Sequence, residues 1–217
     1  STLMRSSAAS DVYKRQCKDK GQRLFAYEYS GYWKDVGTLG SYWEANMELI
    51  DIVPEFNLYE EYWRIYTKGD IIPPQYIAAD AVTDCCLIGE GTEIYGEVYH
   101  SVIGPNVVIG KGTVVKDSII MRNTVIGENS VLDKAIIAED VTVGDNVIIG
   151  CGEEAKNVLK PAVYAFGLAT IGEQSVIPDN VKIGRNTAIS GITAAEDYPN
   201  GILESGQVIK AKDGEQS

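Results

Sequence analysis

Six-residue units such as Ile103-Gly104-Pro105-Asn106-Val107-Val108 and Ile109-Gly110-Lys111-Gly112-Thr113-Val114 recur between Ile88 and Ile189. Each unit begins with an aliphatic residue that is usually followed by glycine or by a small or polar residue. A period of six fits neither an amphipathic helix nor a simple hairpin strand. It fits a solenoid in which each unit is one short strand plus a corner, and three units complete one triangular coil. We therefore predict a mainly β fold, a parallel β-helix built from hexapeptide repeats.

The aliphatic positions of the repeat predict which side chains fill the core. Most of them are six residues apart, but the gap from Ile94 to Ile103 is nine, and the repeat breaks between Ile149 and Ile171. We expect residues 150–170 to form an insertion that leaves the coil, and about fifteen repeats to give about five coils. The predicted inward residues are Ile88, Ile94, Ile103, Ile109, Val115, Ile120, Ile126, Leu132, Ile137, Val143, Ile149, Ile171, Ile177, Ile183 and Ile189.

The chain before the repeat has a different character. Residues 1–16 are polar, lack the apolar core of a signal peptide and show no periodicity, so we interpret them as a non-native leader. Residues 17–70 are predicted to be an α/β fragment with a strand at 23–29, because that stretch is aromatic-rich and partly alternating. We expect residues 71–217 to be the β-helix domain.

Two helices are expected in the α/β fragment. The first opens at Ser41, which has capping-box spacing to Glu44, and places Trp43, Met47 and Ile50 on one face. This helix should end before Pro54. The second helix is shorter and aromatic and covers residues 57–65.

Charge and composition exclude some partners. The formal net charge of −12 argues against nucleic acid and against an anionic membrane surface as general partners. No apolar run approaches the roughly 20 residues of a membrane span. The four cysteines have no metal-ligand spacing, which is typical of reduced thiols in a cytoplasmic protein.

The densest functional signal is Gly31-Tyr32-Trp33-Lys34-Asp35-Val36-Gly37-Thr38, which follows the predicted strand. A carboxylate at such a place can hold Mg²⁺ between substrate phosphates, and the ring of Trp33 offers a flat face for a sugar. The same residues also fit a plain strand-to-helix turn in which Asp35 caps a helix and Trp33 lies in the core. Both interpretations stay open on the residues alone.

This segment and its continuation, Leu39-Gly40-Ser41-Tyr42-Trp43-Glu44-Ala45-Asn46, resemble glucose-1-phosphate adenylyltransferase, the ADP-glucose synthase of bacterial glycogen synthesis. Pro73-Pro74-Gln75-Tyr76, Gly96-Glu97-Val98, Ser101-Val102-Ile103 and Asp117-Ser118-Ile119-Ile120-Met121 also fit that family, over residues 17–212 in all. The resemblance implies a left-handed β-helix and the conversion of ATP and glucose 1-phosphate into ADP-glucose and pyrophosphate with Mg²⁺. It assigns Asp35 as a metal ligand and places Trp33 and, more weakly, Lys34 at the substrate.

Other elements of that family are not found in this sequence. They are its glycine-rich nucleotide loop with an arginine, its first metal-binding aspartate and its Glu-Lys-Pro sugar-phosphate segment, all of which would precede Cys17. A phosphoryl-transfer site needs in-line positioning and several cations around the phosphates. We therefore expect the chain to be the C-terminal part of a cytoplasmic enzyme and to be inactive alone.

The resemblance also implies a homotetramer and an effector site near the β-helix. Lys156 and Lys160, in the expected insertion, are candidates for binding a sugar-phosphate activator, although two lysines in a solvated loop have the same pattern. Two alternatives remain for the function. One is a non-catalytic regulatory or oligomerisation paralogue. The other is a hexapeptide-repeat acyltransferase with His100, the single histidine, as general base.

Overall fold

The computed structural model describes residues 8–210 except 24, 26, 65, 67, 68 and 70, and side chains from residue 14 onward. The chain divides into two compact units, Ser1–Trp33 and Lys34–Ser217. The first unit contains helix α1 (Ala8–Asp19). This helix begins inside the segment that we interpreted as a leader, and we did not predict a helix there. The described residues within 23–29 form no strand, so that prediction was wrong. A strand requires a hydrogen-bonding neighbour, and none of the described residues supplies one there.

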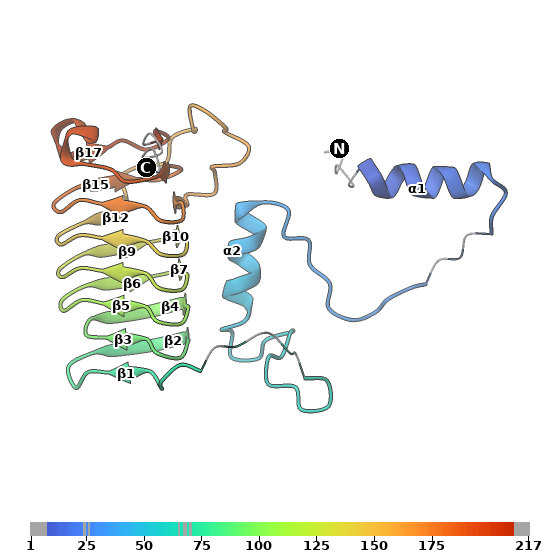
Figure 1. Cartoon of the computed structure of the whole chain (residues 1–217), viewed down its shortest axis with the longest axis horizontal. Coiled ribbons are helices and arrows are strands. Elements are labelled where there is room, and N and C mark those ends of the chain that lie inside the picture. The colour runs from blue at the N-terminus through green and yellow to red at the C-terminus, as the bar shows by residue number, and fades with distance from the viewer. Residues whose placement is uncertain are drawn as a thin grey trace. The chain divides into compact units, whose positions relative to one another are not determined.

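The second unit is dominated by a parallel β-helix, as predicted (Figure 1). Its strands stack in three faces, and every pairing between neighbouring coils is parallel. The first face is a six-stranded sheet of β1 (Tyr76–Ile77), β3 (Glu93–Ile94), β5 (Val108–Ile109), β8 (Val125–Ile126), β11 (Thr142–Val143) and β14 (Val176–Ile177). The other two faces form one twelve-stranded sheet because β2 (Val82–Ile88) and β4 (Glu97–Ile103) continue around the corner between them.

The second face stacks those two long strands with β6 (Val114–Lys116), β9 (Val131–Asp133), β12 (Ile148–Cys151), β15 (Lys182–Gly184) and β17 (Ile202–Leu203). The third face stacks them with β7 (Ile119–Ile120), β10 (Ala135–Ile137), β13 (Ala169–Ile171), β16 (Ala188–Ser190) and β18 (Val208–Lys210). Each face thus has six or seven strands, so the prediction of about five coils was too low. The regular repeat runs from Ile88 to Ile189 and does not extend to the ends of the stack, where the units depart from it. Two 3-10 helices, η1 (Ala195–Asp197) and η2 (Pro199–Gly201), interrupt the last coil.

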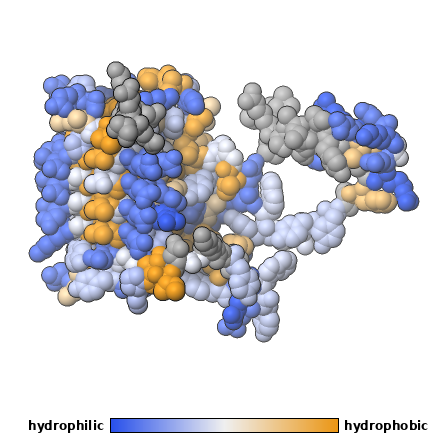
Figure 2. All heavy atoms as spheres, in the orientation of Figure 1, coloured by the Kyte–Doolittle hydropathy of each residue, from blue (hydrophilic) through white to orange (hydrophobic). Residues whose placement is uncertain are grey.

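The predicted inward side chains fill the interior of the coils. All are buried except Ile88, which is partly buried and packs against the same core at the first coil. The strands of successive coils pair in the same register, so residues of the same kind stack on one another. One such series is Ile103, Ile120, Ile137, Ile171 and Ile189. Columns of hydrophobic and of hydrophilic residues therefore run along the stack in Figure 2. Most of the stabilisation then comes from contacts between neighbouring coils.

The corners of the coils need left-handed backbone. Asn106, Asn123, Asn129 and Asn146 all have φ between 54° and 57°. Asparagine tolerates this region better than most residues because its short polar side chain can bond locally. The side chains also link successive corners, since Asn106 Nδ2 donates to Asn123 Oδ1 at 3.2 Å and Asn123 Nδ2 donates to Asp140 Oδ1 at 2.8 Å. The polar residues of the repeat thus hold the turns while the aliphatic residues form the core.

Helix α2 (Leu39–Glu48) packs on the outside of the third face. Its N-cap is Thr38, which exchanges hydrogen bonds with Ser41, so the cap that we predicted at Ser41 was three residues too late. The predicted face of Trp43, Met47 and Ile50 is confirmed, and the helix ends before Pro54 as expected. These side chains contact the outward aliphatic residues Val102, Ile119 and Ile136. The sequence carries the signal for this contact, because Val102-Ile103, Ile119-Ile120 and Ile136-Ile137 place an aliphatic residue on both sides of the strand.

The helix predicted at residues 57–65 was also wrong, since the described residues 57–64 form turns and bends. Asn57 Oδ1 accepts a hydrogen bond from the Tyr59 N–H, and Glu60 Oε1 accepts one from the Tyr62 N–H. Such local side-chain bonds compete with the helical backbone pattern. Tyr62 and Trp63 are exposed, so this short segment has no packed face to stabilise a helix.

Candidate functional site

The segment 31–38 is divided between the two compact units. Trp33 ends the first unit and is 74% exposed, whereas Lys34 begins the second unit. Trp33 is therefore not a core residue within the described structure, contrary to the plain-turn interpretation. The residues from Lys34 onward belong to the same unit as the β-helix.

Asp35 lies on the surface in the turn that precedes α2. Its Oδ1 accepts a hydrogen bond from the Gly37 N–H at 3.0 Å, which fixes the carboxylate within its own turn. The helix cap is Thr38, so Asp35 does not perform that role. An exposed carboxylate held by its own backbone is a suitable single ligand for a hard cation such as Mg²⁺. The described residues include no group of three or more His, Cys, Asp or Glu side chains that could hold a metal ion, so Asp35 does not belong to such a cluster among them.

Lys34 is directed to α2. Its Nζ lies 3.6 Å from Glu44 Oε2 and also donates a hydrogen bond to Glu48 Oε1, and its side chain is partly buried. These two carboxylates are one helical turn apart, so a single ammonium group can contact both. The structure therefore shows Lys34 holding the 34–38 turn against the helix.

The chain between β12 and β13, residues 152–168, carries no strand and lies outside the coils. Two buried asparagines attach it to the β-helix. Asn157 Nδ2 donates to the Asn186 carbonyl at 2.8 Å, and Asn157 Oδ1 accepts from the N–H groups of Leu159 and Lys160. Asn186 Nδ2 donates to the Ala155 carbonyl at 2.9 Å. These bonds fix the backbone beside Lys156 and Lys160, whose residues are both exposed.

This 152–168 loop meets the first turn of α2. The ring of Phe166 lies directly against Gly40, where a Cβ atom would come within 2.8–2.9 Å of three ring carbons. Leu168 packs into the same cluster as Met47. A hollow of about 300 Å³ lies beside this contact and is lined by Val36, Gly37, Thr38, Leu39, Tyr42, Ala162 and Val163. The structure thus brings the Asp35 turn and the loop of the two candidate lysines together.

Trp43 ties the middle of α2 to the β-helix. Its Nε1 donates to the Asp117 carbonyl at 2.7 Å, and the Lys134 ammonium lies 5.4 Å from the centre of its ring. A cation over an indole ring is attractive, as is a satisfied indole N–H in a partly buried place. The sequence predicts Trp43 on the buried face of the helix, but it carries no signal for these two partners.

His100 is a corner residue of the β-helix. Cys85, His100, Asp117 and Lys134 all have φ between 44° and 53° and occupy the same corner in successive coils. His100 Nδ1 lies 2.5 Å from Asp117 Oδ1, which is the residue of the next coil. A histidine paired with a carboxylate resembles a general base and its orienting partner. Here the stacking of corners accounts for the pair, and His100 lines neither the hollow beside α2 nor the hollow at residues 58–64.

Cys86 is a poor candidate for a nucleophile. Burial raises the pKa of its thiol above the ordinary value, with only partial compensation by backbone hydrogen bonds. A reactive cysteine needs a lowered pKa because the thiolate is the attacking species. Cys86 therefore belongs to the packing of β2.

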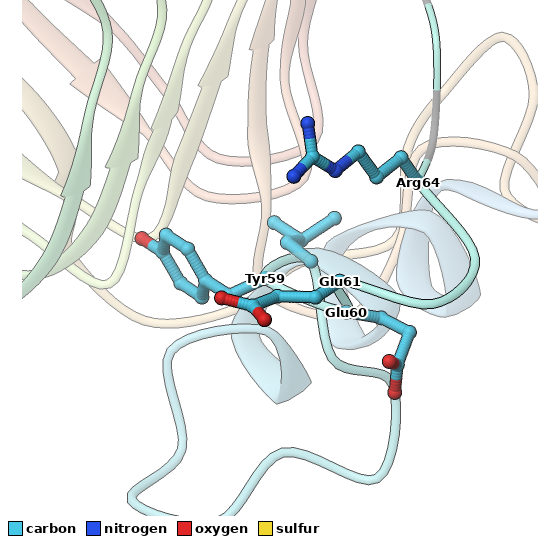
Figure 3. Close-up of a pocket in the computed structure, with 5 residues that line it drawn as sticks. Tyr59, Glu60, Glu61 and Arg64 are labelled. Carbon is cyan, nitrogen blue, oxygen red and sulfur yellow. The ribbon is translucent and has the colours of Figure 1, made fainter.

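A further hollow of about 410 Å³ lies within the surface segment 58–64, before the β-helix (Figure 3). It is lined by Leu58, Tyr59, Glu60, Glu61 and Arg64. Figure 3 shows the Glu60 carboxylate pointing away from the Tyr59 ring and the Arg64 guanidinium. All the lining side chains are close neighbours in sequence. This hollow is therefore formed by a local bend of the chain and brings no distant groups together.

Sequence comparisons show which proteins this chain is similar to. The chain is 65% identical over 193 residues to glucose-1-phosphate adenylyltransferase of Lachnospira eligens, covering 89% of this chain and 46% of that protein. The chain is homologous to the glucose-1-phosphate adenylyltransferases. The adenylyltransferases of Acetivibrio thermocellus and Thermotoga neapolitana are 43% identical over 190 residues and 49% identical over 199 residues. The resemblance that we recognised in residues 31–46 is thereby confirmed.

The chain spans about half the length of the curated adenylyltransferases it matches, between 45% and 47%. A family model described as "GlmU-like, C-terminal hexapeptide" matches residues 77–159, which agrees with the hexapeptide β-helix. Neither helix in the described part of the chain is long and apolar enough to cross a membrane.

Proposed function

We propose that the chain is the C-terminal part of an enzyme that makes ADP-glucose and pyrophosphate from ATP and α-D-glucose 1-phosphate for glycogen biosynthesis. The observation that carries this proposal is the 65% identity over 193 residues. A match of that length in a chain of 217 residues includes both the 31–38 segment and most of the β-helix. In the proposed reaction an oxygen of the glucose 1-phosphate attacks the α-phosphorus of ATP, and pyrophosphate leaves. Asp35 would supply one carboxylate oxygen to Mg²⁺, which would neutralise phosphate charge.

Trp33 and Lys34 would lie at the sugar phosphate. Lys34 binds two carboxylates of α2 in this structure, so its contribution to a substrate would be to hold the Asp35 turn as well as to supply charge. We also propose that the enzyme is a cytoplasmic homotetramer, with the β-helix providing exposed sheet faces and ends for assembly. The 65% identity to an adenylyltransferase favours that reaction over the acyltransferase alternative.

The purified 217-residue chain should not form ADP-glucose by itself. The described residues contain no cluster of three or more metal-ligating side chains, whereas phosphoryl transfer needs several groups around the phosphates. The measurement is ADP-glucose formation from ATP, glucose 1-phosphate and Mg²⁺, with the full-length protein as the positive control. Turnover by the isolated chain would contradict the prediction that it is inactive alone. An inactive full-length protein would contradict the proposed enzymatic function.

Lys156 and Lys160 would bind a sugar-phosphate activator. Their backbone is fixed by Asn157 while both residues remain exposed, which suits a preformed anion site. In the full-length enzyme, Lys156→Glu with Lys160→Glu should raise the activator concentration needed for half-maximal response roughly tenfold or more, by replacing attraction with repulsion. The control is Lys182→Glu on β15, which changes the same charge at another exposed site. An unchanged activator response in the double variant would rule out these lysines.

A further inference from the structure

We infer that Phe166 is a positioning residue, through which the 152–168 loop holds the first turn of α2 and, with it, the Asp35 carboxylate. This inference rests on the proposed function for the role of Asp35, but the contact itself does not depend on it. The effect would be to make the geometry of the carboxylate depend on the state of the loop.

The first observation is the backbone of Phe166. Its φ of 66° lies in the left-handed region, where a bulky residue is an outlier. The residue remains 49% exposed, so burial alone does not explain why phenylalanine occupies this position. Strained residues that persist are often held by a specific contact. Phe166 and Gly167, whose φ is 72°, form a turn in which the Leu168 N–H donates to the Ala165 carbonyl at 3.3 Å, and in this turn the Phe166 ring contacts Gly40.

The second observation is the absence of a side chain at Gly40. Glycine is an unfavourable residue in a helix, yet Gly40 lies in the first turn of α2 and is buried. Any other residue there would place its Cβ within 2.8–2.9 Å of three carbons of the Phe166 ring. The close contact therefore accounts for the glycine at position 40, because only glycine leaves room for the Phe166 ring.

A continuous path joins this contact to Asp35. Gly40 lies between Thr38 and Ser41, whose side chains and backbones form the capping box. Next to Thr38 is Gly37, whose N–H donates to Asp35 Oδ1 at 3.0 Å. A shift of the first helical turn would move the cap and the turn together, since they share consecutive residues.

The loop side of the contact is anchored on the β-helix. Gly167, next to Phe166, donates its N–H to Asn186 Oδ1 at 2.8 Å, and Asn186 is buried. The same asparagine holds Ala155 and Asn157 at the start of the loop. Asn186 therefore connects the backbone near Lys156 with the backbone of Phe166.

The test compares Phe166→Ala, Phe166→Leu, Gly40→Ala and the double variant Gly40→Ala/Phe166→Ala by amide hydrogen exchange in this chain. Phe166→Ala should speed exchange of the Ser41 and Tyr42 amides roughly fivefold or more, which corresponds to losing a helix cap. Phe166→Leu should retain most of the protection because an apolar side chain remains. Gly40→Ala should also speed exchange, since its methyl group displaces the ring. The double variant should recover protection because the new methyl occupies the space that the ring leaves.

Val158→Ala serves as the matched control, because Val158 is an exposed apolar residue of the same loop. It should leave exchange in α2 unchanged. Unchanged exchange in Phe166→Ala, or simple addition of the two single effects in the double variant, would overturn the coupling. In the full-length enzyme, Phe166→Ala should also raise the Mg²⁺ concentration for half-maximal rate about tenfold. Altered exchange with an unaltered Mg²⁺ requirement would overturn the link to Asp35 and leave the proposed reaction standing.

Discussion

Asp35→Asn in the full-length protein is expected to lower the rate of ADP-glucose formation at least about 100-fold, since losing even an outer partner of a metal site commonly costs 10–100-fold. The asparagine removes the negative charge that would bind Mg²⁺ but keeps an oxygen at the position of Oδ1. The hydrogen bond from the Gly37 N–H, 3.0 Å long, can therefore persist. The loss of rate would then report the charge of the carboxylate and not the shape of its turn.

Asp84→Asn is the matched control for this prediction. Asp84 is an exposed carboxylate on β2, and its replacement changes the net charge by the same amount. The steady-state rate should be measured over a range of Mg²⁺ concentrations, with thermal unfolding recorded for both variants. Wild-type activity in Asp35→Asn would contradict the metal role of this carboxylate.

The β-helix could be predicted from the sequence because its information is local and repeated. Each unit carries its own inward aliphatic residue and its own corner residue, so a single unit such as 109–114 already shows the pattern of the whole. The pattern weakened at the ends of the solenoid, where the units around Tyr76 and Ile202 lack the Ile-Gly pair. The extra coils were missed for that reason.

The segments before the β-helix were predicted less well because their structure depends on partners. The stretch 23–29 has the alternation of a strand but no hydrogen-bonding neighbour among the described residues. The stretch 57–65 has apolar residues at helical spacing, but Tyr62 and Trp63 are exposed and have no surface to pack on. Only α2 was predicted well, and it is the segment that packs on the outward aliphatic residues of the third face.

In the candidate site, too, local features could be predicted from the sequence and contacts between distant residues could not. The chemistry of Asp35 was visible in its own eight-residue segment. The contact of Phe166 with Gly40 joins positions 126 residues apart in the sequence, and neither residue has a chemical signature of its own. The glycine inside the first turn of a predicted helix was the one available signal, since glycine there lowers helix stability and calls for a packing reason.

A substitution in the core of the β-helix is expected to have a large effect on the stability of the fold. Ile137→Ala should lower the free energy of unfolding by about 2–5 kcal/mol, the usual range for truncating a fully buried isoleucine. Ile137 lies inside the stack and pairs in register with Ile120 on one side and Ile171 on the other. The narrow interior cannot close over the cavity without moving both neighbouring coils, so the cost should fall in the upper part of that range.

Val125→Ala is the matched control, because Val125 lies on β8 with 41% of its surface exposed. It should change stability by less than about 0.5 kcal/mol, as surface substitutions usually do. Urea denaturation measures both changes. In a solenoid the damage should also be local, because each coil contacts only its neighbours. Hydrogen exchange in Ile137→Ala should therefore accelerate most in β7, β10 and β13, and uniform acceleration along the whole stack would contradict nearest-neighbour stabilisation.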